Sequence, residues 1–271
     1  MNMYKVRIDN FDLEQVAKSG QCFRWLKNGE NTYNIAAFGR EVDITQNGNE
    51  FTLSCDEDEW NNIWKDYLDI DTDYGKIAKL IEEGDDEHLK EAYRLGFGVR
   101  ILKQDLWEII VTFMISQNNN IKRITNSVEL LCSRCGRTLQ GSMARYDFPK
   151  PDEAGDEIFE DRSMGFGYRA AYLRELFEFA RMTPDWLDNL KKMSYDEAMA
   201  ELLKRKGIGK KVADCICLFG LHHVDAFPID THVKQLLNEY YKDGFDFERY
   251  KGVAGIIQQY LFYYELIKEK K

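Results

Sequence analysis

The segment GIGKKVADCIC, residues 207–217, carries two lysines directly after a Gly-x-Gly turn and continues into an apolar stretch with two cysteines. At helical spacing Lys211, Cys215 and Leu218 share one face, whereas Lys210 points about 100° away toward solvent. An ordinary lysine, with a pKa of about 10.4, is uncharged in roughly one molecule in 2,500 at pH 7, and burial raises that fraction. We interpret Lys211 as a candidate nucleophile. The alternative is a surface lysine that extends its amine from an apolar face into water.

Asp230, about twenty residues further on in the segment AFPIDTHV, is the second candidate. Its position favours the N-cap of a helix, where the positive end of the helix dipole keeps a carboxylate ionised. An ionised carboxylate there can orient a nearby amine or stabilise a developing sugar cation. The capping role and the catalytic role are compatible.

The glycines of the same segment predict a helical hairpin in which one helix ends at Gly207 and the next begins near Gly209. Backbone N–H groups at the start of the second helix can bind a phosphate oxygen, aided by the helix dipole. The cations that crowd around this turn are Lys204, Arg205, Lys206, Lys210 and Lys211. These features favour a phosphate contact on DNA; the alternative is an ordinary helix connection with solvated charges at the helix end.

The net charge of −10 speaks against a nucleic-acid partner until its distribution is considered. Residues 56–87 contain thirteen acidic residues against three lysines, so this segment carries the whole excess of negative charge. The remainder of the chain is close to neutral. The acidity of the whole chain therefore leaves room for a local DNA-binding surface.

The elements that must position these residues predict an α+β fold with two domains. Residues 1–97 combine short alternating apolar segments with Asn-Gly turns at Asn28 and Asn47, which indicate an antiparallel sheet with accompanying helices. Residues 98–271 have helical periodicity, interrupted by three asparagines at 118–120. Asp105 and Ser194 are predicted N-caps, the second within a capping box.

The cysteines and apolar segments argue against several protein classes. A chain of 271 residues with 44% hydrophobic residues can build its core without disulfides, so we expect reduced thiols. Cys132 and Cys135 have the spacing of half a zinc site, but no second close pair completes it, so no metal bound through side chains is expected. No apolar run approaches the roughly 20 residues that span a bilayer, and the N-terminal residues do not form a secretory signal. We expect a cytoplasmic monomer with no membrane segment, associated with the nucleoid if the source is prokaryotic.

Residues 204–233 resemble the helix-hairpin-helix and Gly/Pro-Asp signature of the base-excision DNA glycosylases, through the hairpin GIGKKVAD and the segment PIDTH. Within that superfamily, further segments resemble the 8-oxoguanine DNA glycosylases and extend from near the N-terminus to about residue 262. They are SGQCFRW (19–25), GVRILKQD (98–105), SQNNNIKR (116–123), GFGYRA (165–170) and VADCIC (212–217).

This resemblance implies a TBP-like N-terminal sheet domain, an all-helical helix-hairpin-helix glycosylase domain, and damaged double-stranded DNA as the partner. It implies that Lys211 attacks C1′ of an 8-oxoguanine nucleoside paired with cytosine and forms a Schiff base, with Asp230 as the catalytic aspartate. Strand cleavage by β-elimination would follow. An enzyme that acts on a base must extrude it and fill the gap left in the stack.

The base pocket implied by the resemblance consists of four further residues. The carbonyl of Gly20 would accept a hydrogen bond from N7–H of 8-oxoguanine, a proton that guanine lacks. Cys215 and Phe262 would lie on either side of the base, and Gln258 would complete the pocket.

The contacts to the rest of the DNA are implied in the same way. The side chains that would hold the cytosine left behind are Asn118, Arg123 and Arg169. Tyr168 would be the wedge that fills the gap. The groups that would bind phosphate are His232 and the amides of Gly207, Gly209 and Val212.

The departures from the family pattern lie in the hairpin. Lys206 stands in place of a usual proline, and Lys210 in place of a usual threonine. In the family, the hairpin binds a monovalent or calcium ion, whose ligands here would be the carbonyls of Leu203, Arg205 and Ile208; the added lysines oppose that ion. No four-cysteine cluster follows the last helices, so no iron–sulfur cluster and no required cofactor are expected.

Two alternatives compete with this interpretation. An alkyl-purine glycosylase of the same fold would use water and no lysine, and a non-catalytic hairpin module would only dock on DNA. The lysine at position 211 favours the lyase interpretation over both.

Overall fold

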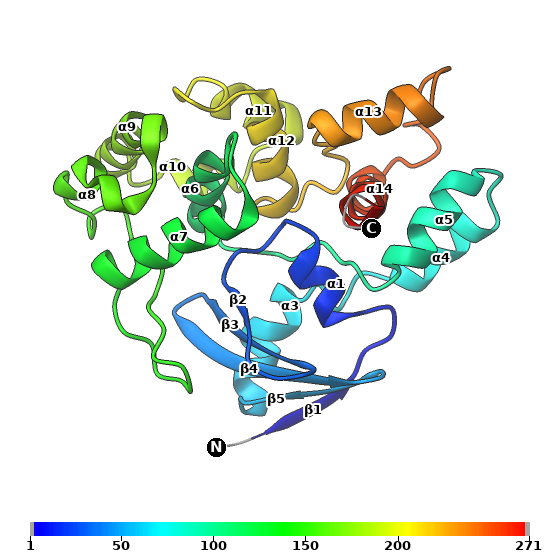
Figure 1. Cartoon of the computed structure of the whole chain (residues 1–271), viewed down its shortest axis with the longest axis horizontal. Coiled ribbons are helices and arrows are strands. Elements are labelled where there is room, and N and C mark those ends of the chain that lie inside the picture. Colours follow the sequence, from blue (N-terminus) through cyan, green and yellow to red (C-terminus); the bar gives the residue numbers. More distant parts are fainter. Residues whose placement is uncertain (1–2, 269–271) are drawn as a thin grey trace.

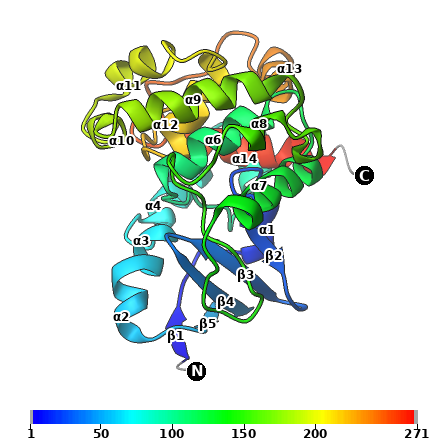
Figure 2. The same ribbon diagram turned by 90° about the vertical axis from the view of Figure 1, so that its left-hand side faces the viewer.

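A five-stranded antiparallel sheet underlies a larger group of helices in the computed structural model, which describes residues 3–268 (Figures 1 and 2). The strand order is β1-β5-β4-β3-β2. The strands are β1 Tyr4–Arg7, β2 Trp25–Lys27, β3 Thr32–Ala37, β4 Arg40–Asn47 and β5 Glu50–Leu53. The predicted α+β fold with an antiparallel sheet is confirmed.

The two Asn-Gly sequences both lie in hairpin connections. Asn47 pairs with Glu50 across a two-residue turn in which Gly48 adopts a φ of +60°, a conformation that glycine adopts without strain. Asn28 begins a longer loop, closed where its N–H donates to the Thr32 carbonyl at 2.9 Å. The register of the sheet is therefore set by local turn chemistry.

The helices fall into two sets along the chain. The first set is α1 Leu13–Lys18, α2 Glu57–Glu59, a π-helical turn Trp60–Trp64, α3 Lys65–Tyr67, α4 Tyr74–Glu82 and α5 Glu87–Gly96. The second set is α6 Leu106–Ser116, α7 Ile121–Cys135, α8 Glu157–Glu160, two 3-10 turns at Arg162–Met164 and Gly167–Arg169, α9 Ala170–Met182, α10 Trp186–Leu190, α11 Tyr195–Leu202, α12 Lys210–Phe219, α13 Thr231–Tyr240 and α14 Ala254–Lys268.

Capping side chains fix where several of these helices begin. Asp105 accepts from the Glu108 N–H at 2.9 Å at the start of α6, and Ser194 forms a capping box with Glu197 at the start of α11. Asn120 caps α7, so the asparagine run separates α6 from α7 as predicted. These boundaries follow from local chemistry, and the sequence predicts them correctly.

The buried apolar residues form two hydrophobic cores, and these cores do not coincide with the predicted domains 1–97 and 98–271. Trp60, Trp64 and Tyr67 pack with the sheet, whereas α4 and α5 bury their apolar residues in the core of the helical part. Helix α5 lies along α14, which Figure 1 shows end-on beside α4 and α5. The domain boundary after residue 97 stays a prediction. The apolar residues of α4 and α5, which precede that boundary, pack in one core with the helices that follow it.

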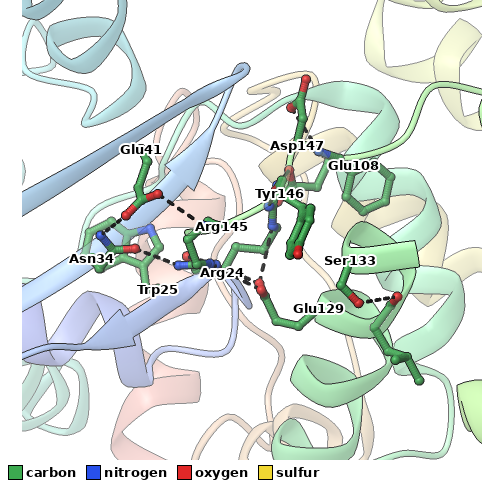
Figure 3. A network of polar contacts seen from close by, with 12 residues as sticks. Arg24, Trp25, Asn34, Glu41, Glu108, Glu129, Ser133, Arg145, Tyr146 and Asp147 are labelled. Carbon is green, nitrogen blue, oxygen red and sulfur yellow. Dashed lines mark hydrogen bonds and ion pairs between the residues drawn. The ribbon is translucent and has the colours of Figure 1, made fainter. Parts of the chain in front are cut away.

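A buried network of charges joins the sheet to α6, α7 and the loop before Phe148 (Figure 3). Arg24, only 2% exposed, lies 3.3 Å from Glu108 and 3.4 Å from Glu129. Arg145 contacts Glu129 at 2.7 Å and donates to the Asn34 side chain on β3 at 2.9 Å. Each buried arginine thus has a carboxylate partner, without which its burial would be strongly unfavourable.

Glu108 is the titratable member of this network at neutral pH. Burial raises its pKa to about 7 from an ordinary value of 4.5, against the opposing attraction of Arg24. The folded protein therefore binds this proton more tightly than the unfolded chain does. Its contribution favours folding below about pH 4.5, and that contribution is lost as the pH rises through about 7.

We predict that Glu108→Gln, which keeps an oxygen facing Arg24 and removes the titration, weakens the pH dependence of stability. Between pH 5 and 8 the unfolding free energy of the wild type should fall by about 3 kcal/mol more than that of the variant. Urea unfolding of both proteins across this range measures the difference. Parallel curves for the two proteins would contradict the prediction.

Candidate active site

Lys211 lies where α12 emerges from the core. All eight residues from Val212 to Phe219 are buried, whereas Lys211 is half-buried and Lys210 is exposed. The Lys211 amine is 5.7 Å from the centre of the Phe113 ring, a cation–π distance. The fixed position of the buried helix therefore holds the amine against an aromatic wall.

Cys215, one turn further along α12, is buried beside this amine. Burial raises the pKa of its thiol to about 11, although the Lys211 amine lowers it. The thiol is therefore protonated at pH 7. It serves as a polarisable apolar surface rather than as a nucleophile.

A narrow pocket with a free volume of about 40 Å³ brings together the predicted catalytic residues and the predicted base-binding residues. Its walls come from the loop after α1, from α6, α12 and α14, and from the segment before α13. The residues that line it are Gly20, Phe113, Lys211, Cys215, Phe219, Pro228, Asp230, Gln258, Gln259 and Phe262. Sequence analysis did not assign Phe113, Phe219, Pro228 or Gln259 to this site.

Gly20 and Phe262 close this pocket. Gly20 has a φ of +77°, and a Cβ placed on it would lie 3.2 Å from the Phe262 ring, so ring and backbone are in close contact. Buried Gln21 holds the loop in place through hydrogen bonds to the Arg100 carbonyl and the Leu102 N–H. A space of about 40 Å³ holds a few waters at most, so a purine can enter only after the walls of the pocket move apart.

Asp230 caps α13 as predicted, accepting from the Val233 N–H at 2.9 Å. The same residue lines the pocket with Lys211, and its charge is among the causes that raise the pKa of Cys215. One carboxylate therefore serves helix capping and faces the amine pocket. The predicted capping role is confirmed, and the catalytic role stays a prediction.

A wider groove of about 830 Å³ runs past this pocket across the hairpin. The predicted residues that line it are Asn118, Gly209, Lys211, Val212, Asp230 and His232. Gly209, the N-cap of α12, has no capping side chain, unlike the N-caps of α6, α7, α11 and α13. The amides at the start of α12 are thus available to an anion in the groove.

Of the residues predicted to contact the opposite base, Asn118 lines this groove. Asn118 and Arg123 are exposed, and Tyr168 is 56% exposed with its ring 4.6 Å from the Arg169 guanidinium. Arg169 itself is buried and donates to the carbonyls of Gln117 and Asn118, the latter at 2.9 Å. In this state Arg169 braces the loop that presents Asn118, whose φ of +46° is unusual for a residue other than glycine.

The three residues whose carbonyls are predicted to bind an ion lie in and next to the hairpin turn. The Ile208 N–H donates to the Arg205 carbonyl at 3.1 Å, which forms the tight turn. The Lys206 amine pairs with Glu175 on α9 at 2.6 Å, so its charge is partly neutralised there. Leu203 lies in the turn after α11.

Among residues 3–268, no three or more histidine, cysteine or acidic side chains gather into a metal site. None of the helices in this range has both the length and the apolar character needed to cross a membrane.

A half-buried lysine in a narrow pocket, next to the uncapped start of α12, agrees with the arrangement that the resemblance to the helix-hairpin-helix DNA glycosylases implies. Residues 3–110 match the family model described as the N-terminal domain of 8-oxoguanine DNA glycosylase. The chain belongs to the 8-oxoguanine DNA glycosylase family.

Relatives with curated names support this assignment. The chain is 38% identical over 268 residues to the N-glycosylase/DNA lyase of Saccharomyces cerevisiae, which covers 85% of this chain and 68% of the relative. It is 32% identical over 250 residues to the N-glycosylase/DNA lyase OGG1 of Arabidopsis thaliana, which covers 82% of this chain. The chain spans 64% of the length of that plant relative.

A solved structure agrees over the whole chain. The 8-oxoguanine glycosylase/lyase of Clostridium acetobutylicum, in complex with double-stranded DNA containing cytosine opposite 8-oxoguanine, is 32% identical. The two structures have a TM-score of 0.89, and the match covers 100% of this chain and 98% of the relative.

The two hairpin glycines should tolerate substitution differently. Gly207 has a φ of +85°, and a Cβ there would lie 2.7 Å from the Tyr172 side chain, whereas a Cβ on Gly209 meets no atom within 4 Å. We predict that Gly207→Ala lowers the unfolding free energy by about 2 kcal/mol and Gly209→Ala by less than about 1 kcal/mol. Urea unfolding of both variants provides the comparison. Equal losses would contradict this view of the turn.

Proposed function

We propose that this protein is a bifunctional DNA glycosylase/AP lyase that excises 8-oxoguanine opposite cytosine. The observation that carries the proposal is the position of Lys211 and Asp230 in one pocket with Gly20, Cys215 and Gln258. The relative from Clostridium acetobutylicum binds DNA that contains this base pair, which supports the same substrate here.

The chemistry begins with the uncharged amine of Lys211. Its nitrogen bonds to C1′ of the everted nucleotide, and the base leaves with the electrons of the glycosidic bond and takes up a proton. The Asp230 carboxylate at the start of α13 stabilises the positive charge that develops on the sugar. The C1′–O4′ bond of the sugar ring then breaks as O4′ takes up a proton, which leaves a protonated Schiff base. Loss of a proton from C2′ then expels the 3′ phosphate by β-elimination and cleaves the strand.

The groove across the hairpin binds the DNA backbone. The uncapped amides of α12 and the exposed Lys210 suit a phosphate, in a contact that is independent of sequence. Tyr168 fills the stack after the base leaves, and Asn118 and Arg123 hold the cytosine, which offers acceptors at its pairing edge. Arg169 also contacts the cytosine when its guanidinium gives up a hydrogen bond to the carbonyl of Gln117 or Asn118 and donates to the base instead.

A monovalent or calcium ion in the hairpin is part of the proposal. The carbonyls of Leu203, Arg205 and Ile208 would hold it. The Lys206 amine pairs with Glu175 on α9, so its positive charge is partly neutralised and repels such an ion less. When bound, the ion adds positive charge near the phosphate site. No step of the chemistry depends on it.

The lysine nucleophile can be tested by borohydride trapping on a duplex that contains 8-oxoguanine opposite cytosine. Wild type should form a covalent adduct, and Lys211→Gln should form none, because the amide has no nucleophilic nitrogen. Lys210→Gln is the matched control, since Lys210 is the exposed neighbour on the same turn. It should keep the adduct and lose some affinity for DNA.

Other outcomes of this experiment identify the alternatives. Release of alkylated purines without an adduct would favour a monofunctional alkyl-purine glycosylase. DNA binding with no base release would favour a non-catalytic hairpin module. An adduct that persists in Lys211→Gln would refute the assigned nucleophile.

Asp230→Asn separates the two roles of the carboxylate. Asparagine caps a helix as well as aspartate does, so the variant should unfold at the same urea concentration as wild type. Its single-turnover excision rate should fall about 100-fold or more, because the charge is lost. An unchanged rate would show that Asp230 serves only as a cap.

A further inference from the structure

Two adjacent glutamines of α14, Gln258 and Gln259, lie in the wall of the base pocket. Both are almost fully buried, at 2% and 3% exposure, and both line the pocket. A buried amide must satisfy donors and an acceptor, so the hydrogen bonds of this pair decide which atoms remain for a ligand.

The Pro228 carbonyl sets the orientation of both amides. A carbonyl can only accept, and Gln258 Nε2 donates to it at 3.0 Å, so Gln258 must turn its Oε1 away from Pro228. That oxygen accepts from Gln259 Nε2 at 3.2 Å. These two hydrogen bonds form a relay that runs in one direction, from the Gln259 amide through the Gln258 amide to the Pro228 carbonyl.

Gln259 Oε1 ends the relay without a partner. Among residues 3–268 nothing donates to this buried oxygen. An unpaired buried acceptor is unfavourable, and such atoms in a pocket indicate a donor that arrives with a ligand. Gln259 lies about one turn before Phe262 on α14, and both residues line the pocket.

We propose that Gln259 is a specificity-determining residue of the base pocket. Its Nε2 donates to the Gln258 oxygen and so stabilises the orientation that the Pro228 carbonyl sets, and its own Oε1 adds a second acceptor. The glutamine pair then supplies two acceptor oxygens to the pocket wall that also contains Gly20, whose carbonyl is a predicted third acceptor. This set fits a purine whose pairing edge carries donors at N1 and N2, as in 8-oxoguanine, and opposes 8-oxoadenine, whose N1 is an acceptor. The inference rests on the proposed excision of 8-oxoguanine.

Gln259→Leu and Gln259→Glu test this relay in single-turnover excision of 8-oxoguanine and 8-oxoadenine. Leucine removes both the donor and the acceptor, so the preference for 8-oxoguanine should fall about 10- to 100-fold. Glutamate is isosteric but turns a carboxylate oxygen toward Gln258 Oε1, and the repulsion should reduce the preference at least as much. Tyr260→Phe is the matched control, because it removes a buried unpaired hydroxyl from the same helix outside the pocket. It should leave the preference unchanged.

Thermal unfolding distinguishes specificity from a structural role. Gln259→Leu should unfold close to the wild-type midpoint, since it removes one unpaired buried oxygen and leaves another, Gln258 Oε1, without its donor. If it does not fold, the near-isosteric Gln259→Met provides the same ratio of rates. An unchanged preference in the folded variants would overturn the inference while the proposed function stands. Failure of the wild type to excise 8-oxoguanine would overturn both.

Discussion

The burial of α12 is the constraint on which the rest of the site depends. From Val212 to Phe219 every residue of this helix is buried, so it cannot rotate or slide without disrupting the core. Lys211 directly precedes this buried run on α12, so the packing of the helix fixes where the lysine lies. Helical geometry then places Cys215 beside the amine. A half-buried lysine between an aromatic ring and a protonated thiol follows from the packing of one helix.

The charge of the protein is arranged around the same helix. The hairpin end of α12 has an uncapped N terminus and a basic surround, while the acidic excess lies in residues 56–87. Figure 1 shows α3 and α4, the labelled helices of that segment, away from the hairpin of α11 and α12. Repulsion between phosphates and the acidic segment is therefore weakened by distance and screening. This separation explains how an acidic chain can present a DNA-binding groove.

Local chemistry explains what could be predicted from the sequence. Caps such as Asp105, Ser194 and Asp230, and the turn at Gly48, depend on neighbours within a few residues. The pocket walls Phe219 and Pro228 come from segments that meet only in the folded chain, so spacing could not identify them. The same holds for the packing of α5 along α14 and for the pairing of Arg24 with Glu108. The carbonyl contacts of Arg169 depend on the backbone of a distant loop, which no motif encodes.

The central claim is that one amine among several nearby lysines reaches C1′ of the everted nucleotide. Peptide mapping by tandem mass spectrometry of the reduced protein–DNA adduct tests it most directly, because the exposed Lys210 lies next to the half-buried Lys211. The proposed geometry predicts that the sugar remnant is found on Lys211 alone. A remnant on Lys210, or spread over the lysines of the hairpin, would contradict it.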